Sequence, residues 1–205
     1  MNLSFISNTC VGAGLFHRFN IKPYNNPFIS TLIPDDTQFV KLVNNLHYYA
    51  SVLPVIETPK INYYNHREIK TPYPVVFLDD IEIHCIHETD NAICLDKFSR
   101  RFERFKDFLK DSNNKVYAVL SFSELISNND FPQSLITDFL QPVSTDIIKI
   151  FVGPTKWRTE QHIHYIGINE WDNVELTKNE SNIFTFNDQS RLNDSFFNYI
   201  NNIHS

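Results

Sequence analysis

The sequence predicts an α/β fold, with a single domain built on one layered, mostly parallel sheet that carries helices on both faces. The first observation behind this is that short apolar runs, typical of buried strands, alternate along the chain with amphipathic segments, typical of helices. The second is the length of 205 residues, in which no linker or internal repeat separates one part from another. With 42% hydrophobic and 20% charged residues, such a chain can bury one sizeable core. We therefore expect a single domain over residues 1–205.

The N-terminal part begins with an apolar strand over residues 3–7, followed by a short helix over 11–19. Asp35 or its neighbour can cap a second helix over 37–49, in which apolar residues recur at helical spacing. These elements give the strand–helix order that an α/β fold requires.

The middle and C-terminal parts continue the alternation. Residues 54–74 contain four prolines, so we interpret them as an irregular loop or a lid over the sheet. A strong amphipathic helix begins at Asp90 and runs to about residue 111. Further strands are expected over 75–78, 81–85, 116–122, 147–152, 161–168 and 183–186, and further helices over 131–140 and 191–203.

Charge and cysteine content exclude several classes of protein. The net charge of −6 argues against nucleic acid or an anionic membrane surface as the main partner. Three irregularly spaced cysteines do not form a disulfide framework, which favours a reducing compartment. No apolar run is long enough to cross a bilayer, and the N-terminus lacks the features of a secretion signal. We expect a cytoplasmic protein without membrane insertion.

Cys10 is the main candidate for chemistry. It follows the first predicted strand within Ser7-Asn8-Thr9-Cys10-Val11-Gly12, where an α/β fold usually places its functional groups. The start of the following helix can lower the pKa of such a thiol and favour the thiolate. Asn8 and nearby backbone N–H groups could hold an oxyanion, and Gly12 would let a ligand approach the backbone closely. Ser7 is a further candidate for binding the substrate or cofactor. The alternative is a small buried hydrophobic residue, the ordinary role of a free cysteine.

A thiol nucleophile needs a base, and His84 and His87 are the best candidates because they end a predicted strand. His17 lies too far along one straight helix to touch Cys10, but it could line the same pocket. The Asp79-Asp80 pair could orient a histidine as the third member of a triad, or could simply form a turn.

A zinc site is disfavoured, and we expect no metal. His84, Cys85, His87 and Cys94 have the right side chains, but neighbouring strand residues point to opposite faces and the spacing matches no standard zinc pattern.

Arg100, Arg101 and Arg104 form the densest positive cluster of this acidic chain. They can be a solvated helix face, or a clamp for the phosphates of a coenzyme or sugar phosphate. The patterns typical of kinases, dehydrogenases, zinc peptidases and serine hydrolases are absent from the sequence.

Over residues 3–125 the chain resembles bacterial exopolysaccharide and capsule biosynthesis proteins. The segments that carry this resemblance are FISNTCVGAGLF, the Asn-Pro-Phe at 26–28, DTQFVKLVNNLHYY, YPVVFLDDIEIHCIHE and FSRRFERFKDFL. Related proteins have been labelled papain-like cysteine peptidases, and a more distant capsule family is regarded as a coenzyme-A-binding acyltransferase. The resemblance matches Cys10, His84 and His87 to its motif, and the three arginines to its arginine-rich helix. The chain departs from it at Val11 and Cys85, where aromatic residues are commoner.

The resemblance implies an enzyme of surface-polysaccharide synthesis that transfers an acyl group, most simply acetyl from acetyl-CoA, to a sugar hydroxyl. Cys10 would be the nucleophile or lie beside the thioester, and the arginines would bind the coenzyme phosphates. Its partners would be a sugar or polysaccharide acceptor and capsule-assembly proteins. The alternatives are a papain-like thiol hydrolase, which needs no coenzyme, and a non-enzymatic glycan-binding or assembly protein, in which Cys10 only packs.

Overall fold

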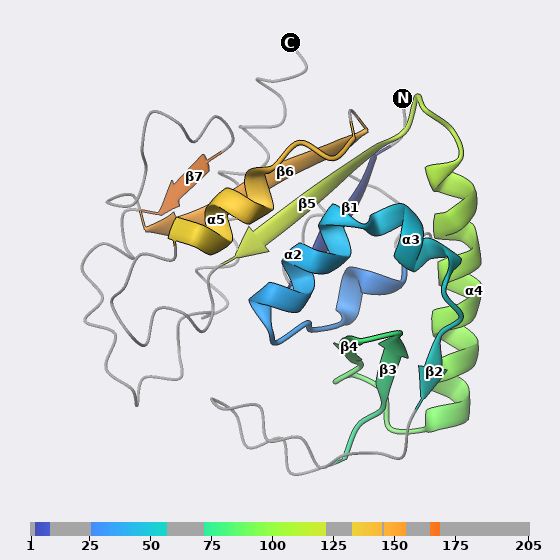
Figure 1. The fold of residues 1–205 in the computed structure, drawn as a ribbon. Helices are drawn as coiled ribbons and strands as arrows, with labels where there is room; N and C mark the ends of the chain where they lie inside the picture. The colour runs from blue at the N-terminus through green and yellow to red at the C-terminus, as the bar shows by residue number, and fades with distance from the viewer. Residues whose placement is uncertain are drawn as a thin grey trace, which may run out of the picture.

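The computed structural model describes residues 3–8, 26–56, 72–121, 133–144, 146–154 and 165–168, and it contains two sheets (Figure 1). The first has four parallel strands in the order β1-β5-β6-β7, and the second has three antiparallel strands in the order β2-β3-β4. The bounds of the strands are β1 Leu3–Ser7, β2 Val55–Ile56, β3 Val75–Leu78, β4 Ile81–His84, β5 Lys115–Ser121, β6 Ile147–Pro154 and β7 Tyr165–Ile168.

The α/β class with a mostly parallel sheet is confirmed, but the expectation of one layered sheet is wrong. The hairpin of β3 and β4 belongs to the second sheet. Only the two residues Asp79 and Asp80 separate these strands, which suffices for an antiparallel hairpin, whereas a parallel crossover needs a dozen residues or more. The segment 54–74, expected to be a loop or lid, contains β2 near its start, and its residues 57–71 lie outside the described part. The elements expected over 11–19, 183–186 and 191–203 also lie outside it.

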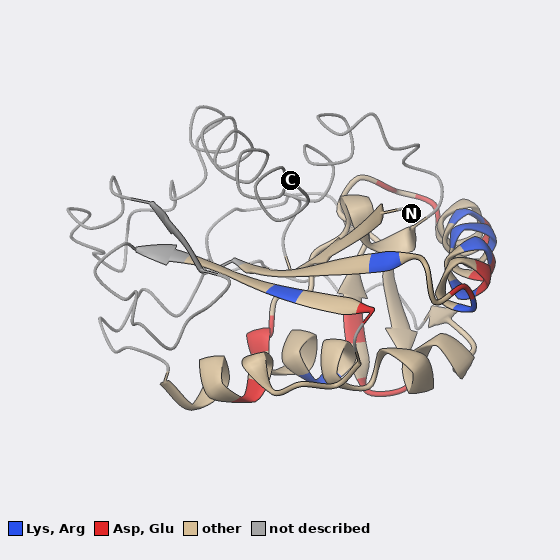
Figure 2. Cartoon of the chain, turned by 90° about the horizontal axis from the view of Figure 1, so that it is seen from above, with Lys and Arg blue, Asp and Glu red and all other residues tan. Residues whose placement is uncertain are grey.

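β5 is the centre of the parallel sheet. Its residues from Val116 to Leu120 are almost fully buried, as expected for a strand with neighbours on both edges. Helix α2, Asp36–Asn44, contacts β5, and α5, Gln133–Leu140, contacts β6. Both helices lie on the same side of the sheet (Figures 1 and 2). The sequence predicts helices on both faces of the sheet. Among the described residues, these two helices cover one face.

The helix expected over 37–49 is divided at Asn45 into α2 and α3, Leu46–Ser51. Asn45 has φ −127° and ψ 33°, outside the helical region, and its side-chain amide donates to the Lys41 carbonyl at 3.0 Å. Asparagine side chains compete in this way with the backbone hydrogen bonds of a helix. The break lets the polar faces of both short helices meet the hairpin.

Helix α4, Asn91–Leu109, begins where the sequence predicts, with the Asp90 carboxylate accepting from the Ile93 N–H at 2.8 Å. Its buried stripe contacts Phe28 in the short 3-10 helix η2, Pro27–Ser30, and the ring centroids lie 5.7–6.4 Å apart with edge-on geometry. The stripe consists of Cys94, Phe98, Phe102 and Phe105. No helix in the described part of the chain is long and apolar enough to cross a membrane.

The connecting segment, which we define as residues 26–33, joins the two sheets. At its start Asn26 is fully buried, and its amide nitrogen donates to the Phe5 carbonyl at 2.5 Å and to the Ser4 hydroxyl at 3.0 Å. The Asn26 side-chain oxygen accepts from the Phe28 N–H at 2.7 Å, which caps η2. One side chain thus holds β1 and the start of the segment together.

The end of the connecting segment contacts both sheets through its backbone. The Ile33 N–H donates to the Asn8 carbonyl at 3.0 Å, just beyond β1. Leu32 pairs with His84 at the end of β4, exchanging two hydrogen bonds of 2.9 and 2.8 Å. The carboxyl ends of β1 and β4 therefore lie on either side of residues 32–33.

Lys149 lies buried in β6, although a lysine is costly to bury. Its ammonium donates to the Asn44 side-chain oxygen at 2.6 Å and to the Gln141 carbonyl, and it lies 5.9 Å from the centre of the Phe139 ring. Burial lowers the pKa of Lys149 from 10.5 to about 8. Its two hydrogen-bond acceptors are neutral, so they only partly offset the loss of solvation.

We expect Asn26→Ala to destabilise the fold by about 2–3 kcal/mol. The change removes three buried hydrogen bonds and leaves the Phe5 carbonyl without this donor. Urea unfolding measures the effect. Asn113→Ala is the matched control, since Asn113 is exposed, and it should change the free energy of unfolding by less than about 0.5 kcal/mol. Equal effects of the two variants would contradict the role given to Asn26.

We expect Lys149 to make stability rise with pH between about 8 and 10.5. In this window the unfolded chain binds more protons at this lysine than the folded chain does, so raising the pH favours folding. Lys149→Met removes this pH dependence. Between about pH 8 and 10.5 the free energy of unfolding of the wild type should therefore rise by on the order of 3 kcal/mol relative to that of the variant. Urea unfolding of both proteins at several pH values tests this. A constant difference between them would contradict it.

Candidate functional site

The candidate site begins at the carboxyl end of β1, three residues before Cys10. Ser7 and Asn8 are both buried there. The Asn8 amide nitrogen donates to the Asp36 carboxylate, in the first turn of α2, at 2.6 Å. This contact gives Asn8 a structural role, fixing the end of β1 against α2, while its role as an oxyanion donor stays a prediction. Cys10, Gly12 and His17 lie outside the described residues.

His84 lies close to this point. It is the last residue of β4, is 5% exposed and pairs with Leu32, whose neighbour Ile33 bonds to Asn8. Two backbone spacings of about 4.8 Å therefore separate Asn8 from His84, or about 10 Å between their Cα atoms. Side chains from the two strand ends can meet across this distance. The sequence predicts that these two strand ends lie close together. They do so because the connecting segment joins them, and not because the two strands share a sheet.

The His84 imidazole lies between a carboxylate and a phenol. Its Nδ1 is 3.1 Å from the Tyr73 hydroxyl, and its Nε2 is 3.5 Å from the Glu82 carboxylate. A neutral imidazole protonated at Nε2 suits both contacts, with the phenol donating to Nδ1. Burial raises the pKa of Tyr73, which keeps the phenol protonated as this donor. Glu82 would stabilise the imidazolium formed when His84 accepts a proton.

The two histidines that the sequence offers as bases differ in burial. His84 is buried among these partners, whereas His87 is exposed three residues further on. The geometry therefore makes His84 the better candidate for the base.

Two partners of His84, Tyr73 and Glu82, are not among the site residues that the sequence predicts. Glu82 has a local signal, because residues two apart on a strand share a face, which puts it on the side of His84. Tyr73 has no such signal, since it lies in the proline-rich segment and reaches His84 only through the pairing of β3 with β4.

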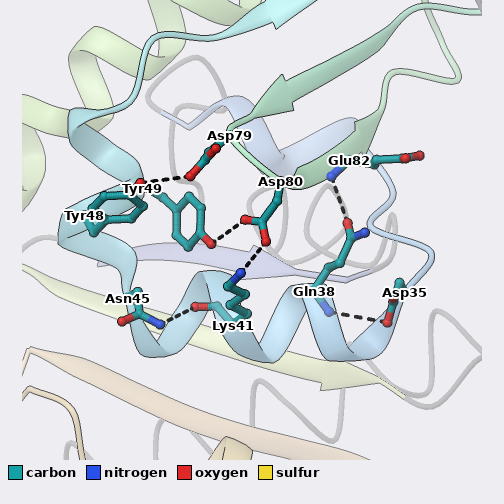
Figure 3. Close-up of polar contacts among 9 residues, drawn as sticks. All are labelled: Asp35, Gln38, Lys41, Asn45, Tyr48, Tyr49, Asp79, Asp80 and Glu82. Atoms are coloured by element: carbon teal, nitrogen blue, oxygen red, sulfur yellow. Dashed lines mark hydrogen bonds and ion pairs between the residues drawn. The ribbon is translucent and has the colours of Figure 1, made fainter.

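Asp79 and Asp80 form the hairpin turn and do not orient a histidine. Asp79 has φ 57°, a left-handed conformation that aspartate tolerates in turns. Their carboxylates contact α2 and α3: Tyr48 donates to Asp79 at 2.9 Å, and Tyr49 and Lys41 donate to Asp80 (Figure 3). The turn is at the opposite end of β4 from His84, about 13 Å along the strand.

These turn contacts also perturb the tyrosines. Burial, followed by the hydrogen bond to Asp80, raises the pKa of Tyr49 to about 12. The hydrogen bonds from Lys41 and Tyr49 lower the pKa of Asp80. Gln38 adds a further link, because its side-chain oxygen accepts from the Glu82 N–H at 2.8 Å. The polar cluster therefore holds the hairpin against the helices, at the end of β4 opposite the candidate base.

Cys85 and Cys94 are buried in the core as free thiols, 4% and 2% exposed. The hydrogen bond between them, together with burial, raises the pKa of the Cys85 thiol. Within the described ranges, no group of three or more histidine, cysteine or acidic side chains is arranged to hold a metal ion.

Two of the three candidate arginines are on the exposed face of α4. Arg100 is exposed and pairs with Asp96 one helical turn away, with 2.8 Å between nitrogen and oxygen, and Arg104 is also exposed. Arg100 lies nine residues beyond the first residue of α4, or about 14 Å along the axis, and Arg104 lies about 20 Å along it. These two arginines fit a solvated helix face better than a phosphate clamp.

Arg101 is placed differently. It is only partly exposed, and its charge acts on the thiol of Cys85, which follows His84 in the chain. Of the three arginines, Arg101 is therefore the one with a shown interaction next to the candidate base.

A cavity of about 430 Å³ opens where Tyr73 meets the start of α4. Its lining residues are Pro72, Tyr73, Thr89, Asp90, Asn91 and Ala92. Tyr73 also contacts His84, so one residue links this cavity with the candidate base.

Comparison with known proteins gives two matches. An uncharacterized protein of Haemophilus influenzae (strain ATCC 51907 / DSM 11121 / KW20 / Rd) is 31% identical over 106 residues, which cover 51% of this chain and 45% of that protein. The match thus spans less than half of the relative's length. No solved structure matches the chain significantly.

The second match is to a family model, that of the domain of unknown function DUF1919, over residues 1–118. This range contains β1, the connecting segment, the hairpin with His84, and α4. The match extends over more than half of the chain, which therefore belongs to the DUF1919 family.

Proposed function

We propose that the protein is a cytoplasmic acyl-transfer enzyme of surface-polysaccharide synthesis, formed as a single domain with a thiol–imidazole site at Cys10 and His84. One observation supports this most. Asn8, just beyond β1 and two residues before Cys10, is joined by residues 32–33 to the strand end that carries the buried His84. The polysaccharide pathway and the acetyl donor are inferred from the sequence resemblance alone.

In the proposed reaction His84 accepts the proton of the Cys10 thiol, and Glu82 stabilises the resulting imidazolium. The thiolate attacks the carbonyl carbon of an acyl donor, a bond from sulfur to that carbon forms, and the donor's leaving group departs with a proton from His84. The oxygen of a sugar hydroxyl then attacks the carbonyl carbon of the acyl-cysteine and gives its proton to His84. The bond from that carbon to sulfur breaks, and His84 returns the proton to the departing thiolate. Backbone N–H groups after Asn8 would hold the oxyanion in both steps.

A specific observation favours a second candidate, a thiol hydrolase that uses the same two residues. Arg100 pairs with Asp96, and Arg104 lies about 20 Å along α4 from its first residue, so a coenzyme clamp made by all three arginines has less support. In a hydrolase, water replaces the sugar hydroxyl and no coenzyme is needed. A non-enzymatic glycan-binding role is the remaining alternative, and the reactivity of Cys10 separates it from both enzymes.

We expect iodoacetamide to label Cys10 selectively in the folded protein, with a pH dependence showing a thiol pKa below the usual 8.5. Cys85 and Cys94 are internal controls, because their burial shields them. His84→Gln should raise the apparent pKa of Cys10, since the thiolate loses its imidazolium partner. Mass spectrometry of each cysteine follows the labelling.

His87→Gln is the matched control for this experiment. It replaces an exposed histidine three residues away and should leave the labelling of Cys10 unchanged. Slow labelling of Cys10, with an ordinary or raised thiol pKa, would overturn the enzyme proposal. Equal effects of the two histidine variants would overturn the role of His84.

We expect coenzyme A to stabilise the protein against heat if the acyl donor is a coenzyme thioester. At ten times its dissociation constant the ligand contributes about 1.4 kcal/mol, which corresponds to a Tm increase of about 2–4 °C. If the arginine clamp operates, Arg101→Ala with Arg104→Ala reduces the shift, whereas Lys106→Ala with Lys110→Ala on the same helix does not. A reactive Cys10 without stabilisation by coenzyme A would favour the hydrolase.

A further inference from the structure

The cavity beside Tyr73 has the chemistry of a binding site for neutral, hydroxyl-rich ligands. Its polar lining consists of the Thr89 hydroxyl, the Asn91 amide and the Asp90 carboxylate, and no lysine or arginine is among its described lining residues. Asp90 is the one charged side chain among the described lining residues, and it already caps the start of α4. Its carboxylate therefore disfavours phosphate and other anions at that helix end. A neutral polyol can donate to the carboxylate and accept from the amide at the same time.

The lining also has capacity for new hydrogen bonds. One oxygen of Asp90 accepts from the Ile93 N–H, which leaves the other facing away from that bond. Pro72 and the Tyr73 ring add an apolar wall, as is usual for small-molecule sites. The volume of about 430 Å³ lies near the lower end of the range for such sites, which suits one or two sugar units.

Tyr73 connects this cavity with the candidate base. It lines the cavity, is 2% exposed, and its hydroxyl lies 3.1 Å from His84 Nδ1. A ligand that contacts Tyr73 therefore changes the hydrogen bond on which the His84 tautomer depends. Glu82, on the other side of the ring, limits the imidazole to few orientations.

We propose that this cavity binds a neutral polyhydroxyl ligand, such as a sugar unit, and that Tyr73 is a positioning residue linking the bound ligand to His84. The binding itself does not depend on the proposed function, whereas identifying the ligand as the acyl acceptor rests on it. The cavity would then hold the acceptor while Cys10 carries the acyl group.

The test is a titration of the full chain with maltose, galactose and, as the charged comparison, inorganic phosphate, followed by two-dimensional ¹H–¹⁵N NMR. We expect at least one of the two sugars to shift the amide signals of residues 89–92 saturably, while phosphate does not. Thr89→Ala with Asn91→Ala should weaken sugar binding about tenfold, the equivalent of about 1.4 kcal/mol. Ser112→Ala with Asn113→Ala, an exposed pair of similar side chains, is the matched control and should bind as the wild type does.

The role of Tyr73 has a separate readout. The sugar should shift the ring nitrogen signals of His84 in the wild type but not in Tyr73→Phe, whose amide shifts at residues 89–92 persist. No saturable shift with either sugar, preferential binding of phosphate, or unchanged binding by the Thr89 and Asn91 variant would overturn the site. If the His84 signals also fail to shift in the control variant, Ser112→Ala with Asn113→Ala, the role of Tyr73 is overturned. Sugar binding together with an inert Cys10 would leave this inference standing and refute the proposed enzyme.

Discussion

The structure depends on the connecting segment, residues 26–33, because it is hydrogen-bonded to both sheets. Asn26 holds its start against β1, and the backbone of Leu32 and Ile33 bonds to His84 on one side and to Asn8 on the other. Phe28, between these points, is in edge-on contact with the buried rings of α4. Among the described residues, the backbone hydrogen bonds that link the hairpin of β3 and β4 with the parallel sheet all pass through this segment. The proximity of the two strand ends, and so the candidate site, follows from this segment.

The two ends of the hairpin have different roles. At the turn, Asp79 and Asp80 bond to tyrosines and a lysine of α2 and α3, which fixes the position of the hairpin (Figure 3). At the other end, His84 is buried between Glu82 and Tyr73, and its backbone is joined to the end of β1 through residues 32–33. A short strand held at one end in this way can present a side chain at the other with little freedom. This is the condition that positioned proton transfer requires.

Membership of the DUF1919 family covers the part of the chain that holds this arrangement, while β6 and β7 lie beyond the matched residues. The chemistry must therefore be argued from the site. A buried imidazole with a carboxylate and a phenol is suited to accept and return protons, and the neighbouring cavity is suited to neutral polar ligands. Of the arginines that the sequence offers as a coenzyme clamp, Arg100 and Arg104 are exposed on α4, whereas Arg101 is partly buried and acts on Cys85.

The sequence alone determined the local elements. Apolar alternation predicted β1, β3, β4, β5 and β6, and Asp90 predicted the start of α4, because these features depend only on residues near in sequence. It also predicted His84 as a candidate base. Only the tertiary structure decided that the hairpin forms its own sheet, that Asn45 divides a helix, that His84 is buried and His87 exposed, and that Tyr73 contacts His84. These outcomes depend on contacts between residues distant in sequence, and such contacts, made here by the connecting segment, leave no periodic pattern in the chain.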